Sequence, residues 1–169
     1  MKILVFNWRD MKHPEAGGAE LVIFKTMEEL KKKGHEITFF VGSFKDASKF
    51  DNYNGMRIIR SGNRFLTYIH GFFYYLSNRK KHDLVYDCVN AVPYWTPLYV
   101  KKKRIVLLHH IAGKIIFKKL YFPMNLVAYL AEQIFLPLFY KNEKFIVVSE
   151  STKKELADLL GIRKEKDGL

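Results

Sequence analysis

Short apolar runs alternate with longer amphipathic segments along the chain. Ile3 to Phe6 is a continuous apolar run, which is typical of a strand buried on both faces of a parallel sheet. From Ala19 to Leu30, apolar residues return at helical spacing, with charged residues between them. Gly34 predicts the end of this helix. A second strand is expected from Glu36 to Val41.

The alternation continues through the rest of the chain. The pattern predicts further strands over 56–60, 83–86, 104–109 and 145–148, and further helices over 66–76, 119–140 and 152–160. The polar stretch 43–55 predicts irregular structure. This order of elements predicts a doubly wound, mostly parallel α/β sheet of the Rossmann-like type, with helices on both faces.

Three local signals refine these helices. Pro123 and Pro137 are expected to kink the helix over 119–140, because proline removes a backbone donor. Thr152 and Glu155 have the spacing of a capping box for the last helix. Gly161 is its expected stop.

The charge balance is strongly basic. Lys and Arg number 29 against 17 Asp and Glu, so the formal net charge is +12. Such a surface favours an anionic partner, which could be nucleic acid, an anionic membrane or a phosphorylated substrate. The single cysteine, Cys88, excludes an intramolecular disulfide, and no Cys/His cluster has the spacing of a metal site. We therefore expect no metal cofactor.

No segment predicts a membrane span or a signal peptide. The most apolar segment, Leu126 to Tyr140, contains Glu132 and Pro137 and falls short of the roughly 20 apolar residues that a spanning helix needs. Met1 leads straight into a strand, without the charged and apolar regions of a signal peptide. We therefore expect a cytoplasmic protein.

The loop after the first strand contains two adjacent glycines, Gly17 and Gly18, directly before a helix. Glycines at this place let a ligand approach the backbone closely, and the free N–H groups of the following helix favour a phosphate. The loop is neither a G-x-G-x-x-G fingerprint nor a Walker A loop. The alternative is a plain tight turn.

Two adjacent histidines, His109 and His110, end the strand predicted over 104–109. Neighbouring residues of a strand point to opposite faces, so one imidazole can face a cleft while the other faces the interior or solvent. A histidine at the carboxyl end of a strand can bind a sugar hydroxyl or a developing charge. The alternative is a structural histidine.

Asp87 and Asn90 form another polar cluster, after the strand over 83–86. At least one of them is expected to cap the next short helix. No second carboxylate is evidently opposed to Asp87, so a glycosidase-like pair is not indicated. Ser149 and Ser151 lack a G-x-S-x-G elbow, so serine nucleophile chemistry is not expected either.

Aromatic and basic residues are mixed in two segments. Tyr68 to Tyr75 precedes Asn78 to Lys81, and Phe117 to Phe122 precedes the apolar helix. Such mixing suits an anionic membrane interface or single-stranded nucleic acid. The alternative is a set of core aromatics beside a solvated basic face.

Taken together and in order, these features resemble the N-terminal domain of the family 4 glycosyltransferases, which are retaining enzymes of the GT-B fold. The resemblance extends from Met1 to about Arg163. It rests on Arg9-Asp10, Pro14-x-x-Gly17-Gly18-Ala19-Glu20, Asp87-x-x-Asn90-x-x-Pro93, Pro97-Leu98, Leu107-Leu108-His109-His110 and Val147-Val148-Ser149-Glu150-Ser151.

The resemblance implies a role for each matched residue. In this family the N-terminal domain chiefly holds the sugar acceptor, and the C-terminal domain binds the nucleotide sugar. Gly17 and Gly18 are assigned to the donor diphosphate or the acceptor, with Glu20, Asn90 and His110 in the same binding region. His109 is expected to face the transferred sugar as the catalytic residue. No metal is implied.

The resemblance also predicts the organisation of the chain. Residues 1–163 are expected to form the acceptor-side domain, and 164–169 to begin an interdomain linker. The nucleotide-sugar-binding domain, with its pair of donor-holding glutamates, is not matched, so this polypeptide alone is expected to be inactive. The basic charge suits a lipid-linked or polysaccharide acceptor, with the enzyme peripheral on the inner face of the cell membrane.

The main alternative is a basic α/β domain that binds nucleic acid, with an affinity that falls steeply as salt rises. That reading leaves the placement of Gly17, Gly18 and His109 without a role, so nucleic acid is the less favoured partner. A receiver-like module is excluded, because Asp10 stands alone after the first strand and the strand over 56–60 ends in Arg60 and Ser61.

Overall fold

The computed structural model describes residues 1–90, 92–111, 113–119 and 121–161. In this part of the chain a seven-stranded sheet has the order β3-β4-β2-β1-β5-β6-β7. All neighbouring strands are parallel except β3 and β4. The strands are β1 (Lys2–Phe6), β2 (Glu36–Val41), β3 (Phe50–Tyr53), β4 (Met56–Arg60), β5 (Leu84–Val89), β6 (Lys103–Leu108) and β7 (Phe145–Val147).

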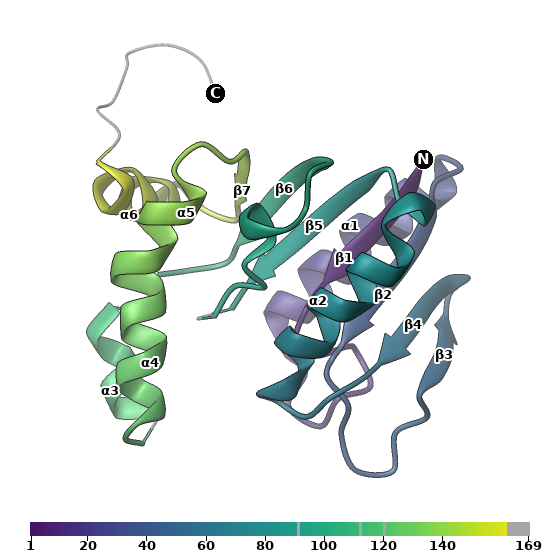
Figure 1. Cartoon of the computed structure of the whole chain (residues 1–169), viewed down its shortest axis with the longest axis horizontal. Helices are drawn as coiled ribbons and strands as arrows, with labels where there is room; N and C mark the ends of the chain where they lie inside the picture. Colours follow the sequence, from purple (N-terminus) through teal and green to yellow (C-terminus); the bar gives the residue numbers. More distant parts are fainter. Residues whose placement is uncertain (91, 112, 120, 162–169) are drawn as a thin grey trace.

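Helices cover both faces of this sheet, as the sequence predicts. Figure 1 shows α2 in front of the sheet, α1 behind it and α4 at its left. The α-helices are α1 (Gly18–Lys32), α2 (Leu66–Asn78), α3 (Ile116–Lys119), α4 (Met124–Leu130), α5 (Leu136–Tyr140) and α6 (Glu150–Leu160). Short helical turns are η1 (Arg79–Lys81), η2 (Thr96–Leu98), η3 (Gly113–Ile115) and the π-turn η4 (Ala131–Phe135).

Alternation along the strands divides the core between these two faces. Ile3 and Val5 of β1 pack in one buried cluster with Phe24 of α1. Leu4 and Phe6 pack in a second cluster with residues of α2. Because successive side chains of a strand point to opposite faces, an unbroken apolar strand needs a helix on each side. The apolar run at the N-terminus therefore dictates the layered architecture.

One strand was missed by the sequence pattern. β3 lies within the stretch 43–55, for which irregular structure was expected, and pairs antiparallel with β4. Asn54 and Gly55 connect the two strands, and both have positive φ angles, of 51° and 79°. This dipeptide is a strong hairpin signal because a tight hairpin turn needs two such residues. The prediction failed because β3, with Asp51 and Asn52, lacks an apolar period.

The helical region near the C-terminus differs from the prediction in two respects. Pro123 precedes α4 rather than kinking a longer helix, and the π-turn η4 leads into α5 at Pro137. A proline ring clashes with the carbonyl four residues earlier, and the wider π-turn avoids an ideal α-helical contact there. Within the described residues, no helix is both long and apolar enough to cross a membrane.

The cap of α6 also differs from the prediction. Ser149, not Thr152, is the N-cap, and its Oγ accepts a hydrogen bond from the backbone N–H of Thr152 at 3.1 Å. The helix therefore begins earlier than the predicted capping box. Gly161 ends the helix with a φ of 64°, as expected. The predicted linker over 164–169 lies outside the described residues.

We expect Gly71→Ala to destabilise the fold. A Cβ atom at this position would lie 2.9 Å from the ring of Tyr94 and 3.1 Å from that of Phe6. Alanine favours a helix by about 1 kcal/mol over glycine, but overpacking costs about 1–3 kcal/mol, so a net loss is expected. Urea unfolding measures it, with the exposed Ser77→Ala on the same helix as control. Unchanged or increased stability would show that α2 is not packed this closely.

Candidate active site at the carboxyl edge of the sheet

The carboxyl ends of β1, β5 and β6 bring the predicted site residues to one edge of the sheet. The Gly17-Gly18 loop follows β1, Asn90 follows β5 and His109 follows β6. Asn90 donates a hydrogen bond from Nδ2 to Oδ1 of the buried Asn7 at 3.1 Å. Ligands of open parallel sheets bind beyond this edge, which agrees with the predicted position of the site.

Gly17 and Gly18 leave the start of α1 open. Gly17 is the N-cap and, having no side chain, caps none of the N–H groups of the first turn, while its own N–H donates to Glu20. A Cβ atom on Gly18 would meet nothing within 4 Å, so packing does not require a glycine there. The first turn of a 15-residue helix therefore presents backbone N–H groups to the edge of the sheet. Such groups and the helix dipole attract an anion.

The buried side chain of Glu20 holds the Gly17-Gly18 loop in place. Its side chain is fully buried and accepts hydrogen bonds from the Gly17 N–H at 2.8 Å and from Arg9 Nε at 3.0 Å. A buried carboxylate is stable only when it is paired and hydrogen-bonded, and Arg9 meets this requirement. Glu20 therefore sets the conformation of the loop and uses protein groups as its partners.

The structure distinguishes the two histidines. His109 is 7% exposed and His110 is exposed. Nε2 of His109 is buried and has no hydrogen-bond partner in the part of the chain that the structure describes. Burial lowers the pKa of His109, and the negative charge of Glu20 opposes this shift. The imidazole is therefore neutral near pH 7, with one ring nitrogen available to a ligand.

Asp87, by contrast, belongs to the core. Its carboxylate is fully buried and accepts hydrogen bonds from the Tyr140 hydroxyl at 2.6 Å and the Thr96 hydroxyl at 2.7 Å. It also accepts from the N–H of Thr96, the first residue of η2, at 3.4 Å, although Trp95 and neither Asp87 nor Asn90 is the N-cap of that turn. Burial raises the pKa of Asp87, and these hydrogen bonds oppose the shift. Asp87 therefore holds β5, η2 and α5 together and is not available to a ligand.

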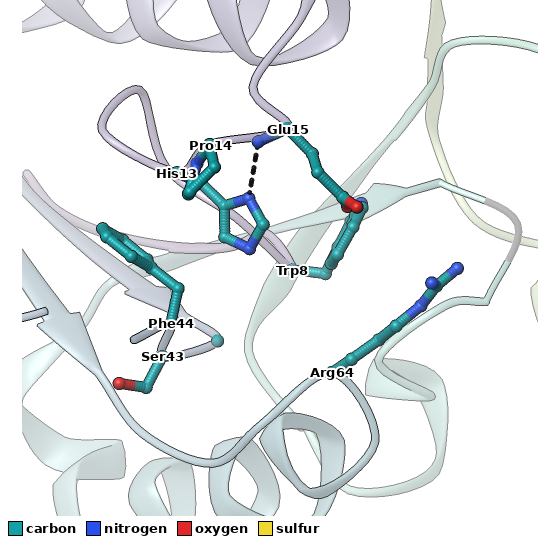
Figure 2. A pocket seen from close by; sticks show the side chains of 8 residues that line it. Trp8, His13, Pro14, Glu15, Ser43, Phe44 and Arg64 are labelled. Carbon is teal, nitrogen blue, oxygen red and sulfur yellow. Dashed lines mark hydrogen bonds between the residues drawn. The ribbon is translucent and has the colours of Figure 1, made fainter. Parts of the chain in front are cut away.

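A pocket of about 320 Å³ lies beside the glycine loop and was not foreseen from the sequence. Figure 2 shows its labelled side chains, with Phe44 and Arg64 approaching from opposite sides. Its lining residues come from the loops after β1, β2 and β4. They are Trp8, His13, Pro14, Glu15, Gly42, Ser43, Phe44 and Arg64.

Aromatic and cationic groups stack in this pocket. The Trp8 ring centroid lies 4.1 Å from Cζ of Arg9 and 5.4 Å from Cζ of Arg64. His13 lies between the Trp8 and Phe44 rings, with centroids 5.5 Å and 5.2 Å away. Aromatic faces bind the C–H surface of a sugar, and cations bind its charged substituents. A tryptophan two residues after the end of a buried strand was the signal that could have indicated this pocket.

A buried ion network lies beneath the pocket. Arg60 is 3% exposed and donates from Nε to Asp10 at 2.5 Å and from Nη2 to Asp51 at 3.1 Å. Nζ of Lys12 donates a hydrogen bond to Oδ2 of Asp51 at 2.7 Å. The network joins the loop after β1 to β3 and β4, and Cζ of Arg60 lies 5.3 Å from the centroid of Phe44. It therefore fixes the floor of the pocket.

The fold defines a Rossmann-like α/β domain with a polar candidate site beyond its parallel strands. The family Glycosyltransferase Family 4 matches residues 16–166. This match includes most of the chain, and the protein therefore belongs to Glycosyltransferase Family 4. No curated protein sequence gives a significant match.

Among solved structures, the chain is similar to sucrose-phosphate synthase from Thermosynechococcus elongatus. The TM-score is 0.55 and the sequence identity is 12%. The match covers 87% of this chain and 47% of the synthase chain. At this identity the similarity concerns the fold, and it confirms the predicted Rossmann-like architecture. The chain spans about half the length of this structural relative.

We expect the free energy of unfolding to decrease at acid pH because of this ion network. The hydrogen bond from Lys12, with those from Asn52 and Arg60, lowers the pKa of Asp51 from 3.8 to about 2. The ionised Asp51 contributes its full stabilisation at pH values above 3.8, the pKa of its carboxyl group in the unfolded chain. This stabilisation is lost as the pH falls through about 2, the pKa in the folded protein. Asp51→Asn should reduce stability at neutral pH and flatten its pH dependence between about 4 and 2. Urea unfolding across this range measures both effects, and parallel curves for the two proteins would contradict the prediction.

We further expect His109 to titrate below 6.5. Burial disfavours the imidazolium, and Glu20 partly restores it. Glu20→Gln should therefore lower the pKa of His109 further, because it removes the compensating charge. NMR titration of the imidazole resonances, assigned with His109→Ala and His110→Ala, measures this value. A pKa at or above 6.5 would show that the ring is hydrated in solution.

Proposed function

We propose that this chain is the acceptor-binding domain of a retaining glycosyltransferase, which transfers a sugar from a nucleotide-sugar donor. Membership of Glycosyltransferase Family 4 carries this proposal. The open glycine loop and the unpartnered His109 nitrogen at the same edge of the sheet support it. Both features are suited to a ligand, and neither is explained by packing alone.

In this proposal the backbone N–H groups of Gly17 and Gly18 approach the donor diphosphate or the acceptor. The neutral His109 ring accepts or donates one hydrogen bond to a hydroxyl of the transferred sugar. Burial strengthens such a contact because water competes less for the same nitrogen. Asn90 and His110 border the same binding region. The reaction proposed here requires no metal ion.

The proposal also assigns acceptor binding and nucleotide-sugar binding to two different domains. The structural match covers 47% of the synthase chain, so a relative of this fold can hold about twice as many residues. We assign residues 1–163 to the acceptor side and the nucleotide sugar mainly to a second domain. That domain would also supply the basic groups that stabilise the departing phosphate. The 169-residue chain by itself would then bind an acceptor without turning over.

The Trp8 pocket is the proposed acceptor site. Its aromatic rings can stack on a sugar, and Arg64 has no carboxylate partner among the described residues. A glycan or a lipid-linked sugar would both suit these groups. A lipid-linked acceptor would place the enzyme peripherally at the inner face of the cell membrane. The net charge of +12 is compatible with that position.

The alternative function is nucleic-acid binding, which the net charge alone favours. Calorimetry with nucleotide sugars, glycans and lipid-linked sugars, beside single-stranded DNA at several salt concentrations, separates the two. Acceptor binding with weak nucleotide-sugar binding would support the proposal. Tight nucleotide-sugar binding would overturn the division of labour, and salt-sensitive DNA binding without sugar binding would favour the alternative.

We expect Trp8→Ala to weaken acceptor binding at least tenfold. Loss of the ring removes the stacking surface, which is worth about 0.5–1.5 kcal/mol beyond buried area. Trp95→Phe is the matched control, since Trp95 packs against Phe135 and Phe139 away from the pocket. Calorimetry with the best acceptor of the panel measures the effect. Equal affinities of the two variants would exclude Trp8 from the acceptor site.

A further inference from the structure

The outer face of α2 exposes a stripe of apolar side chains. Leu66, Ile69, Phe73 and Leu76 recur at helical spacing and are 45%, 53%, 59% and 39% exposed. Phe65, directly before the helix, is 52% exposed. These side chains form one face of the helix, because residues three or four apart lie one above the other. We refer to these five residues as the α2 stripe.

The core does not account for this stripe. The opposite face of α2 buries Thr67, Gly71 and Tyr75. That face makes the contacts to the sheet, where Gly71 lies against Tyr94 and Phe6. The helix is therefore apolar on both sides, and 66–78 contains no Asp, Glu, Lys or Arg. A surface helix of a globular protein ordinarily carries charges on its outer face.

Basic residues lie at both ends of the α2 stripe. Arg64 precedes the helix, and Arg79, Lys80 and Lys81 form η1 directly after it. All four are exposed and make no salt bridge to another described residue. No acidic residue occurs anywhere from 52 to 82. The charged residues of this segment are therefore all basic.

A hollow joins the apolar stripe to the basic end of the helix. Its volume is about 350 Å³, and it is lined by Leu76, Ser77, Asn78 and the three residues of η1. Three cations and two polar side chains at one end of an apolar surface suit a phosphate group attached to a hydrocarbon chain. These protein groups therefore complement an anionic phospholipid, which joins a phosphate to hydrocarbon chains.

We propose that the α2 stripe and η1 dock the protein onto an anionic lipid bilayer, with α2 lying in the plane of the interface. The stripe would enter the boundary between headgroups and acyl chains, while Arg79, Lys80 and Lys81 contact the lipid phosphates. An exposed apolar helix face beside basic residues binds an anionic membrane in this way. This attachment holds independently of the sugar-transfer function, so either proposal can fail without the other.

The stripe favours a bilayer over nucleic acid. Leu66, Ile69 and Leu76 are aliphatic and offer nothing to a phosphate backbone or a stacked base, whereas they gain free energy in hydrocarbon. A second group of exposed apolar residues occurs on α3, on α4 and in the segment before α4. That group comprises Phe117, Tyr121, Phe122, Leu126 and Val127.

Sedimentation with vesicles tests the proposal on the full chain. We expect binding to phosphatidylcholine vesicles that contain phosphatidylglycerol, weakening with salt, and little binding to phosphatidylcholine alone. The double variant Ile69→Ser with Phe73→Ser should lose at least tenfold in affinity through the apolar contact. Lys80→Glu with Lys81→Glu should lose at least as much through charge, most clearly at low salt.

Matched controls lie on other surfaces. Leu21→Ser with Val22→Ser removes two residues of α1 that are 48% and 42% exposed behind the sheet. Lys153→Glu with Lys154→Glu reverses two charges on α6. Both controls should bind vesicles like the original protein, and thermal unfolding establishes that every variant is folded.

Three results would overturn the proposal. They are an absence of binding to the anionic vesicles at low salt, equal binding to both kinds of vesicle, and retained binding when the α2 stripe is made polar. Binding to single-stranded DNA that is lost with Lys80→Glu and Lys81→Glu, without vesicle binding, would instead assign η1 to nucleic acid.

Discussion

The buried carboxylate of Asp87 is the interaction on which the arrangement of this domain depends. It receives hydrogen bonds from Tyr94, Thr96 and Tyr140 and so ties β5 to the following loop and to α5. Tyr94 then carries the connection onward, since its hydroxyl donates to the backbone oxygen of Asn7 at the end of β1. An unpaired carboxylate at this depth would be strongly unfavourable, so these hydrogen bonds offset the free-energy cost of burying it.

The same connection reaches the candidate site. Asn7 accepts a hydrogen bond from Asn90 and donates one to the backbone oxygen of Arg9. Arg9 in turn holds the buried Glu20 beneath the glycine loop. Polar groups of the scaffold are thus satisfied by one another. Among the described residues, the exceptions are the two ring nitrogens of His82, which precedes β5, and Nε2 of His109, which lies at the same carboxyl edge as the open start of α1. An unsatisfied group at a ligand-binding edge is characteristic of functional sites.

Charge is distributed unevenly over the molecule. Around the Trp8 pocket, acidic residues such as Asp10 and Asp51 pair with Arg60 and Lys12. Along the surface from α2 to η1, the basic residues have no acidic neighbours in sequence between 52 and 82. Paired charges fix local structure, whereas unpaired charges beside an apolar surface attract an anionic partner. One domain therefore combines a pocket of about 320 Å³ with a separate basic and apolar surface.

The sequence by itself determined the order of most strands and helices along the chain, the mostly parallel class of the sheet and the edge that carries the candidate site residues. These follow from local periodicity, because an apolar run such as Ile3 to Phe6 has one stable environment. The sequence pattern did not predict β3, because its polar residues do not alternate with apolar ones. It also did not predict that Ser149 is the N-cap of α6, because the start of that helix depends on where the chain leaves β7.

Only the tertiary structure decided which of His109 and His110 is buried, that Glu20 holds the loop, and that Trp8, Phe44 and Arg64 share a pocket. Each depends on contacts between residues distant in the chain. The register of parallel strands and the packing of helices set those contacts, and no local pattern encodes them.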